Sequence, residues 1–239
     1  MHANSLRIAA LAALLAPAVA GAQSTGDEAP LERHSPRAWT FHLQFGGYFP
    51  QIDQEAGLTD APFERVFGSS NRLLTQVGLE RYVFDDFGTL GIGVSVGYAE
   101  FYGKGFFAAG PQAGERSTDN TSFRTVPLQA FAAYRFDVLA QKAGVPLVPY
   151  AKAGVGSWFW WTGGNSGQRA GYSYGGGLQV LLDFFDPRLA AEFDREVGVN
   201  NSYVYVDWAR WKVTGFIGDS NGFDLSDDGI LSVGLALDF

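Results

Sequence analysis

The 239-residue sequence contains no cysteine, which excludes a disulfide framework, a thiolate metal site and a lipid-anchored N-terminal cysteine. Charged residues are also sparse, at 18% of the chain against about 25% in a typical soluble protein. The formal net charge is −8, and a surplus of acid opposes binding to the phosphate backbone of nucleic acid. The composition therefore predicts no nucleic-acid partner, and no motif indicates a bound cofactor.

The sequence also lacks an apolar run of the length, about 20 residues, that a membrane-spanning helix needs. A short apolar run follows Arg7 near the start of the chain, and small residues continue to Ala22. This pattern resembles a secretory signal peptide that is cleaved after Ala22. Without a spanning helix, the remaining chain can cross a membrane only as a closed β-barrel, because lipid cannot satisfy open sheet edges. The expected divisions are a signal peptide over 1–22, a flexible segment over 23–37 and a barrel over 38–239.

Glycine and aromatic residues are abundant, with 31 glycines and 15% aromatics. Over residues 230–239, apolar side chains take every second position and small or polar ones take the others. Alternation that ends on an aromatic residue, here Phe239, is typical of the closing strand of a bacterial outer-membrane barrel. Phe239 also resembles the signal that the barrel-assembly machinery reads. A half-buried strand of a soluble sandwich would give the same alternation, so the other segments must decide.

Seven further segments alternate in the same way, which gives an even total of about eight strands. The pattern predicts an all-β fold, a single antiparallel transmembrane β-barrel with both ends of the chain in the periplasm. Pro127 interrupts the fourth segment and suggests a bulge or an inserted turn there. The expected strands are 39–49, 73–84, 89–101, 126–136, 148–161, 172–182, 203–213 and 230–239.

The connections between these strands alternate in kind. Polar loops without regular structure are expected outside the cell, at 51–70, 103–120, 162–169 and 218–229. On the periplasmic side we expect two turns and one helix, Pro187–Val197, between strands six and seven. Asp186 is a good N-cap for this helix and Gly198 a good stop. Its apolar stripe, which includes Leu189 and Phe193, is expected to cap the floor of the lumen.

The inward-facing positions predict a lumen filled with side chains. Small residues recur on these faces, and an eight-stranded barrel is just wide enough for side chains to fill. The predicted polar core comprises Glu80, Arg135, Lys152 and Asp207, with Lys152 ion-paired because a buried lone ammonium is costly. Tyrosines and tryptophans near strand ends are expected to form two interfacial girdles. They are Tyr48, Tyr82, Tyr134, Trp158, Trp160, Trp161, Trp208 and Trp211.

Five segments of the sequence carry a resemblance to a known family. They are Gly46-Gly47-Tyr48-x-Pro50-x-Ile52-Asp53, Tyr134-Arg135-Phe136-Asp137, Pro146 to Lys152, Asp186-Pro187 through Gly198-Val199-Asn200, and the closing strand. Together they resemble an uncharacterised family of small outer-membrane β-barrel proteins found in myxobacteria and their relatives. The resemblance covers most of the chain after the signal peptide, and it implies the fold and an outer-membrane location. It implies no activity, because none is established for the family.

The sequence offers little catalytic chemistry. His42 is the one histidine within the barrel, but it faces inward near the periplasmic end, away from the outer rim where a lipid-modifying enzyme would act. The acidic loop 218–229 lacks the full ligand pattern of an EF-hand, although weak calcium binding stays open. We therefore predict a non-enzymatic outer-membrane barrel with a structural or loop-mediated role. Its expected partners are outer-membrane lipid, lipopolysaccharide and the barrel-assembly machinery.

The sequence leaves three alternative functions open. A narrow pore, or a binding site for a small apolar ligand at a mouth lined by residues 158–161, would make the protein a transport or binding barrel. A lipid-modifying outer-membrane enzyme is the second alternative. A soluble periplasmic barrel or sandwich is the third, although it would leave the apolar outer faces exposed to water.

Overall fold

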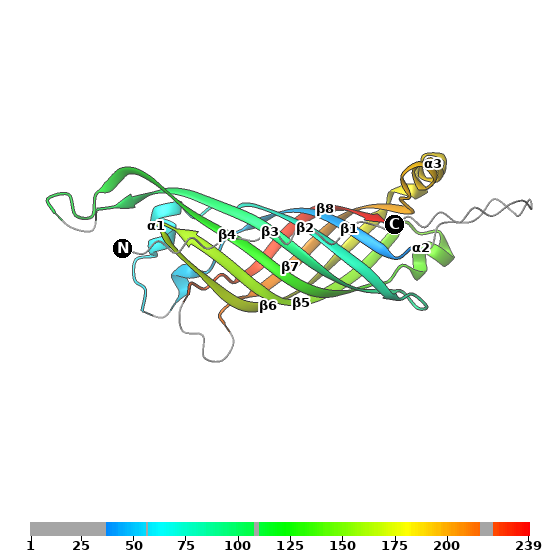
Figure 1. Ribbon diagram of the computed structural model, residues 1–239, viewed down its shortest axis with the longest axis horizontal. Coiled ribbons are helices and arrows are strands. Elements are labelled where there is room, and N and C mark those ends of the chain that lie inside the picture. Colours follow the sequence, from blue (N-terminus) through cyan, green and yellow to red (C-terminus); the bar gives the residue numbers. More distant parts are fainter. Residues whose placement is uncertain (1–36, 56, 108–109, 216–221) are drawn as a thin grey trace, which may run out of the picture. The chain divides into compact units, whose positions relative to one another are not determined.

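The computed structural model describes residues 37–239 apart from 56, 108–109 and 216–221. The predicted signal peptide and nearly all of the flexible segment lie outside the described residues. Within the described part, eight antiparallel strands close into one barrel in chain order, with β1 bonded to β8 (Figure 1). This confirms the predicted fold. The strands are β1 (Trp39–Tyr48), β2 (Arg72–Phe84), β3 (Thr89–Phe106), β4 (Arg116–Arg135), β5 (Leu147–Thr162), β6 (Asn165–Leu181), β7 (Asn201–Lys212) and β8 (Asp227–Asp238).

The two ends of the barrel carry different connections. We call the end at which β1 begins and β8 ends the base, and the opposite end the mouth. The base carries a short turn between β2 and β3, and helix α2 (Val138–Ala143) between β4 and β5. It also carries η2 (Leu182–Phe184) and α3 (Pro187–Val197) between β6 and β7. No helix in the described ranges is long and apolar enough to cross a membrane.

The first connection at the mouth is structured, so the expectation of an irregular loop there is wrong. It contains a 3₁₀ turn, η1 (Ile52–Gln54), and a short helix, α1 (Pro62–Phe67). Both carboxylate oxygens of Asp53 accept backbone hydrogen bonds at the start of α1, from Phe63 N at 2.7 Å and Glu64 N at 2.8 Å. Asp53 thereby satisfies two amide groups that a helix start leaves unpaired. The sequence did not reveal this cap because ten residues separate Asp53 from Phe63.

Two strand pairs reach further toward the mouth than expected. β3 and β4 stay paired as far as Phe106 and Arg116, within the predicted loop 103–120. β5 and β6 are joined by only Gly163 and Gly164, at φ 50° and 87°, within the predicted loop 162–169. A two-residue hairpin turn of this kind needs positive φ at both positions, which glycine adopts without strain. Both extensions are polar, so they carry no apolar alternation that would have marked them as strands.

Pro127 causes neither a bulge nor an inserted turn. Val96 lies opposite Leu128, and Ala99 opposite Thr125, so the register between β3 and β4 is the same on both sides of the proline. The ladder omits the pairs between these two points, where proline has no N–H to donate. The missing N–H group therefore leaves a hydrogen bond of the ladder unmade, and no extra residue is inserted into the strand.

The outward faces of the strands form a continuous apolar ring, which we call the apolar belt. Its side chains are more than a third exposed, from Val77 at 38% to Leu73 at 64%. Exposed apolar area of this extent is unusual for a protein surrounded by water. Representative members are Phe41, Phe45, Leu73, Val77, Ile92, Val94, Leu128, Val155, Tyr172, Leu178, Val206, Trp208, Leu231, Val233 and Leu235.

Glycines on the inner faces leave room for the large side chains that fill the barrel. A methyl group on Gly91 would collide with the side chain of Glu80 on the neighbouring strand. One on Gly93 would meet the ring of Phe131, at 2.7 Å. Small and large residues thus alternate across neighbouring strands, as the sequence predicted for a narrow lumen.

Helix α3 has the predicted bounds and caps, but it does not cap the lumen. Asp186 Oδ1 accepts a hydrogen bond from Leu189 N at 3.1 Å, and Gly198 ends the helix at φ 77°. Leu189 and Phe193 are 54% and 44% exposed, and the helix packs against η2 and β7 (Figure 1). The expectation that these two side chains rest on the lumen floor is wrong. Polar side chains close the base of the lumen. The lumen floor therefore has no apolar surface on which the stripe of α3 could pack.

We expect Gly91→Ala to destabilise the barrel by about 1–3 kcal/mol, the usual range for overpacking a filled interior. Glu80 cannot move aside freely, because Arg135 and His42 hold its carboxylate. Stability is measured by urea unfolding of the protein reconstituted in lipid vesicles. Heat-modifiable gel migration reports the folded fraction at each urea concentration. Gly105→Ala, in the same strand but facing open space, is the control and should change stability by less than about 0.5 kcal/mol. Equal losses in the two variants would contradict the packing explanation.

Candidate functional site

Four charged side chains point into the lumen and form two ion pairs. Arg135 Nη2 lies 2.6 Å from Glu80 Oε2, and Lys152 Nζ lies 2.8 Å from Asp207 Oδ2. They come from β4, β2, β5 and β7, and the two members of each pair reach toward each other across one intervening strand, β3 or β6. The ion pair expected for Lys152 is present. Any functional role for these four residues stays a prediction.

Further side chains extend each pair into a hydrogen-bonded group, and the two groups lie in one layer of lumen side chains. His42 Nε2 lies 2.9 Å from Glu80 Oε2 and 3.3 Å from Arg135 Nη2. Tyr150 donates its hydroxyl to Asp207 Oδ1 at 2.7 Å, and Gln44 donates to Asp207 Oδ2 at 3.1 Å. We call this layer the lumen network. Its members are His42, Gln44, Glu80, Arg135, Tyr150, Lys152 and Asp207.

The lumen network pairs two carboxylates with two cations, and Lys152 and His42 keep part of their side chains accessible, at 26% and 16%. Glu80 and Asp207 are fully buried, and each faces one cation. Removing an ion from water costs several kcal/mol, and that cost is offset only when a partner and further hydrogen bonds are in place. A cavity of about 60 Å³ adjoins the network and is lined partly by Gln76, Gln129 and Gln179. It has room for a few water molecules but not for an open channel.

A second polar layer closes the lumen at the base. Thr40 Oγ1 donates to Asp238 Oδ1 at 2.8 Å, and Thr89 Oγ1 donates to Asp137 Oδ2 at 2.8 Å. The guanidinium of Arg37 lies 3.8 Å from Asp137 and 4.0 Å from Asp238. Thr40, Thr89, Asp137 and Asp238 are all buried. The base is therefore sealed by charge and hydrogen bonds that join β1, β3, β8 and the start of the α2 connection.

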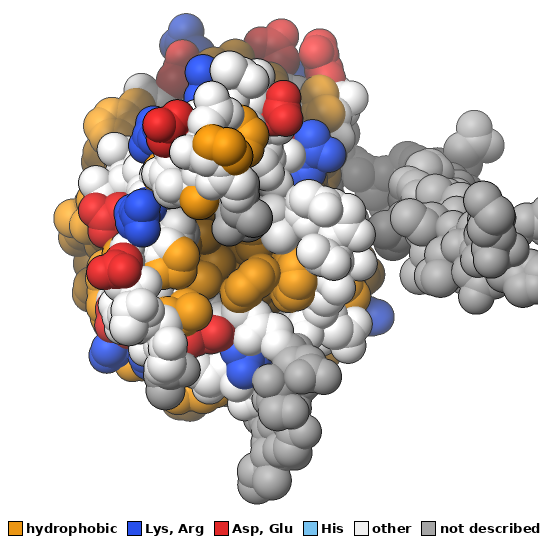
Figure 2. Space-filling view, turned by 90° about the vertical axis from the view of Figure 1, so that its left-hand side faces the viewer, with side chains coloured by type: hydrophobic (Ala, Val, Ile, Leu, Met, Phe, Trp, Pro, Cys, Tyr) orange, Lys and Arg blue, Asp and Glu red, His pale blue; other side chains and the backbone are white. Residues whose placement is uncertain are grey.

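An apolar cluster, which we call the mouth cluster, fills the opposite end. Aromatic rings from the strands pack on rings from α1: the centroid of Phe63 lies 5.3 Å from those of Phe101 and Phe123. Figure 2 shows apolar side chains gathered at the centre of this end, with charged and polar groups around them. The buried members are Tyr48, Ile52, Phe63, Phe67, Leu74, Ala99, Phe101, Phe123, Trp158, Trp160, Trp211, Val213, Leu225 and Ile230.

The mouth cluster corrects the predicted aromatic girdles. Five of the eight aromatics assigned to them point inward, and only Tyr134, Trp161 and Trp208 lie outside, at 40%, 44% and 45% exposure. Strand parity was the available signal, because Trp158 and Trp160 share a face with Lys152 of β5. The contribution of α1 could not be read in this way, since a short helix in a loop has no strand parity. The five inward residues are Tyr48, Tyr82, Trp158, Trp160 and Trp211.

The acidic segment predicted at 218–229 extends into β8, and its described carboxylates form hydrogen bonds and ion pairs within the chain. Asp227 accepts backbone hydrogen bonds from Phe49 N and Gly229 N, each at 2.9 Å. Asp228 Oδ1 lies 2.6 Å from Arg210 Nη2 and 3.3 Å from Lys212 Nζ. Within the described ranges no three acidic or histidine side chains are arranged to hold a metal ion. Residues 218–221 of the predicted loop lie outside the described part, so calcium binding there stays untested.

Comparison with known proteins gives neither a family nor a curated relative, since no family model and no curated sequence matches this chain. Solved structures of small membrane barrels do resemble it. Neisserial surface protein A is 15% identical, with a TM-score of 0.48 over 87% of this chain and 100% of its own. OprG, an outer-membrane protein of Pseudomonas aeruginosa, is 13% identical, with a TM-score of 0.44 over 87% of this chain and 99% of its own. The outer-membrane enzyme PagL is 16% identical, with a TM-score of 0.38 over 84% and 98%. Similarity at this level assigns neither family nor activity, so the resemblance to the myxobacterial family stays a prediction.

We expect Glu80→Ala to destabilise the barrel by about 3–5 kcal/mol, because it leaves the buried guanidinium of Arg135 without its counter-ion. Urea unfolding in vesicles measures the loss. Arg124→Ala is the matched control, since its ion pair with Glu100 lies on the outer surface, where such pairs contribute about 0–1 kcal/mol. A loss for Glu80→Ala no larger than that of the control would show that the lumen network does not stabilise the fold.

Proposed function

We propose that this chain is an outer-membrane β-barrel protein with a closed lumen. In our proposal it acts without enzymatic activity, as a structural or loop-presenting component of the cell envelope. The observation that carries the proposal is a lumen filled at three successive levels inside a barrel that is apolar outside. A conducting barrel would need an open interior, which this arrangement does not provide.

The outer-membrane location is supported by the outer surface together with the strand pairing. All strands are paired on both sides, so no open edge would meet hydrocarbon. The apolar belt provides the surface that acyl chains cover, and water would be a poor environment for it. Lipid, including lipopolysaccharide at the mouth side, is therefore the partner of the belt. The soluble alternative would require this whole surface to stay exposed.

Closure at the base supports a role for Phe239 in assembly. Phe239 N donates to Trp39 O at 2.8 Å, and Ala38 N donates to Phe239 O at 2.7 Å. The last residue thus completes the seam between the first and last strands. In our proposal the assembly machinery recognises this final strand before it pairs with β1.

The position of His42 supports the non-enzymatic assignment. His42 lies inside the lumen beside Glu80 and Arg135, and an ion-paired carboxylate and guanidinium occupy its surroundings. In the described part of the chain, no serine or threonine hydroxyl forms a hydrogen bond to its ring, so a nucleophile and base pair is not formed there. Lipid substrates would also have to pass the mouth cluster or the strand wall to reach it.

A binding site for a small apolar ligand at the mouth is the second candidate. Trp158 and Trp160 favour it, because their rings lie inside the barrel, as an apolar ligand site would require. The space that such a ligand would occupy is taken by Phe63 and Phe67 of α1, which are 6% and 8% exposed. Ligand binding would therefore require α1 to leave its place, which makes this the weaker candidate.

Purified wild-type protein in planar lipid bilayers should give no steady single-channel conductance, because the lumen network and the mouth cluster block the lumen in series. Trp158→Ala thins only the mouth cluster, so it should also stay silent. Heat-modifiable gel migration of the same preparation verifies that the barrel is folded. Steady ohmic steps from the folded wild-type protein would refute the closed lumen.

Incubation of the reconstituted protein with lipopolysaccharide should leave the mass spectrum of its lipid A unchanged. His42→Ala should give the same spectrum, since the ring has no catalytic role in our proposal. Loss or gain of an acyl chain with the wild-type protein, but not with His42→Ala, would overturn the non-enzymatic assignment.

A further inference from the structure

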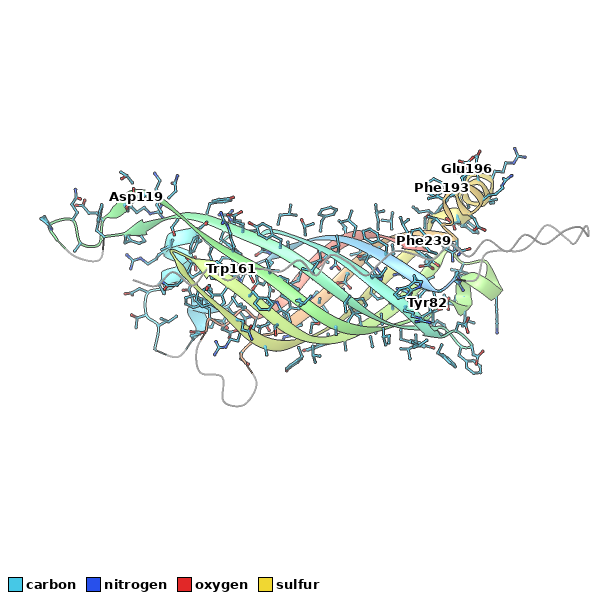
Figure 3. All side chains as sticks on the ribbon, in the orientation of Figure 1. Tyr82, Asp119, Trp161, Phe193, Glu196 and Phe239 are labelled. Atoms are coloured by element: carbon cyan, nitrogen blue, oxygen red, sulfur yellow. The ribbon has the colours of Figure 1, made fainter. Side chains whose placement is uncertain are left out.

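Helix α3 presents an apolar stripe that no described part of the chain covers. Leu189, Phe193 and Val197 follow one another at intervals of four residues and are 54%, 44% and 58% exposed. Such spacing places them on one face of the helix. The caps at Asp186 and Gly198 show that this is a defined helix of eleven residues and not a frayed strand end. Figure 3 shows Phe193 and Glu196 on this helix, beyond the base of the barrel.

The stripe continues an apolar surface that begins on the barrel wall. On β6 the outward face includes Leu178, at 40% exposure, and Leu182 extends it into η2 at 38%. Phe184 and Phe185 then follow at 52% and 68%. Exposed apolar residues therefore continue from the strand through η2 to Phe185, although Asp183 lies among them and Asp186 precedes α3. A medium that covers the belt at the base would also meet this segment.

The other sides of α3 are charged and nearly balanced. Arg188 and Arg195 lie opposite the stripe, and Glu192 and Asp194 lie at its sides. Glu196 lies at the edge of the stripe, seven residues after Leu189. A helix with one apolar face and one strongly charged face is suited to the boundary between water and acyl chains. Because positive charges are not in excess, attraction to anionic lipid contributes little, and burial of the apolar stripe has to provide the binding.

The placement of α3 suits a membrane surface better than a lumen plug or a core element. The helix packs against η2 and β7 and stands outward from the base of the barrel (Figure 1). Ser202 N donates to Asp183 Oδ1 at 3.2 Å, which holds η2 against the start of β7. The chain thus fixes where α3 starts, beside the barrel wall, at the level where the belt ends.

We propose that α3 lies in the headgroup region of the phospholipid leaflet at the base of the barrel, with Leu189, Phe193 and Val197 inserted among the upper acyl segments. This inference rests on the proposed function, since it needs the belt to lie in a bilayer. In a bacterial outer membrane the leaflet at the base is the periplasmic one. The helix then anchors the base of the barrel in that leaflet.

The absence of native cysteine allows the proposal to be tested with single-cysteine variants that carry a nitroxide spin label. The protein is reconstituted in vesicles of phosphatidylethanolamine and phosphatidylglycerol. Phe193→Cys reports the apolar stripe, and Arg195→Cys reports the opposite face, about 200° around the helix. Val206→Cys, on the apolar belt, reports whether the barrel wall is in lipid. Collision of each label with oxygen, which concentrates in lipid, is compared with collision with a water-soluble nickel chelate.

We expect the ratio of oxygen to nickel collision to be several-fold higher at position 193 than at position 195, and high at position 206. Equal, water-like ratios at 193 and 195 would overturn the inference. So would a label at 193 that is shielded from both reagents, because it would indicate docking on protein or on a second copy of the chain. A lipid-like ratio at 206 in either case leaves the proposed function standing, whereas a water-like ratio at 206 in folded protein refutes the proposed function itself. Leu189→Cys repeats the measurement on the same stripe, should the variant at 193 fold poorly.

Discussion

The pairing of β1 with β8 is the interaction on which the rest of this structure depends. It runs from Thr40 opposite Asp238 to Gly46 opposite Ser232, and it leaves no open edge along the sheet. In hydrocarbon each unpaired backbone group would cost several kcal/mol, so closure is the condition for crossing a bilayer with strands. Closure also fixes the width of the lumen. Every second side chain must then fit a space whose size the chain can no longer adjust.

The lumen network follows from that restriction and makes the strand register specific. A slip of one residue in β2 would turn Glu80 toward the acyl chains and leave Arg135 without a counter-ion. Because a buried charge without a partner is far costlier than a paired one, the slipped barrel would be heavily penalised. An apolar filling would penalise the same slip less, since a leucine turned outward would meet lipid at little cost. The ion pairs therefore select one register, whatever their net contribution to stability.

Period-two alternation was sufficient to predict the eight strands and their inward and outward faces, although not the polar extensions of β3, β4 and β6, because strand parity is a local property. Parity and the cost of a buried lone ammonium together predicted the ion pair of Lys152. The caps of α3 were equally local. Trp158 and Trp160 were assigned to a girdle although their parity pointed inward, since aromatic residues near strand ends occur both in girdles and in lumen plugs. The capping of α1 by Asp53 could not be predicted, because it depends on a contact that only the folded connection creates. The direction of α3 also escaped prediction, because helical periodicity identifies an apolar face but not what covers it.

The two ends of the barrel are closed by different interactions, polar at the base and apolar at the mouth. This difference limits which part of the mouth can carry a surface function. At the base, hydrogen bonds around Thr40 and Asp238 are enough to seal a narrow opening. At the mouth, the first connection is drawn inward, because Phe63 and Phe67 complete the apolar cluster. That connection is thereby part of the core, and substitutions on its inner face would disturb the barrel. The paired β3–β4 extension, which carries Asp119 and projects beyond the mouth in Figure 3, contributes no side chain to the mouth cluster, although Arg116 Nη2 donates to Arg65 O of α1 at 3.0 Å. Sequence change is tolerated best where no core contact depends on it, so this hairpin is the part of the mouth best suited to present a variable surface.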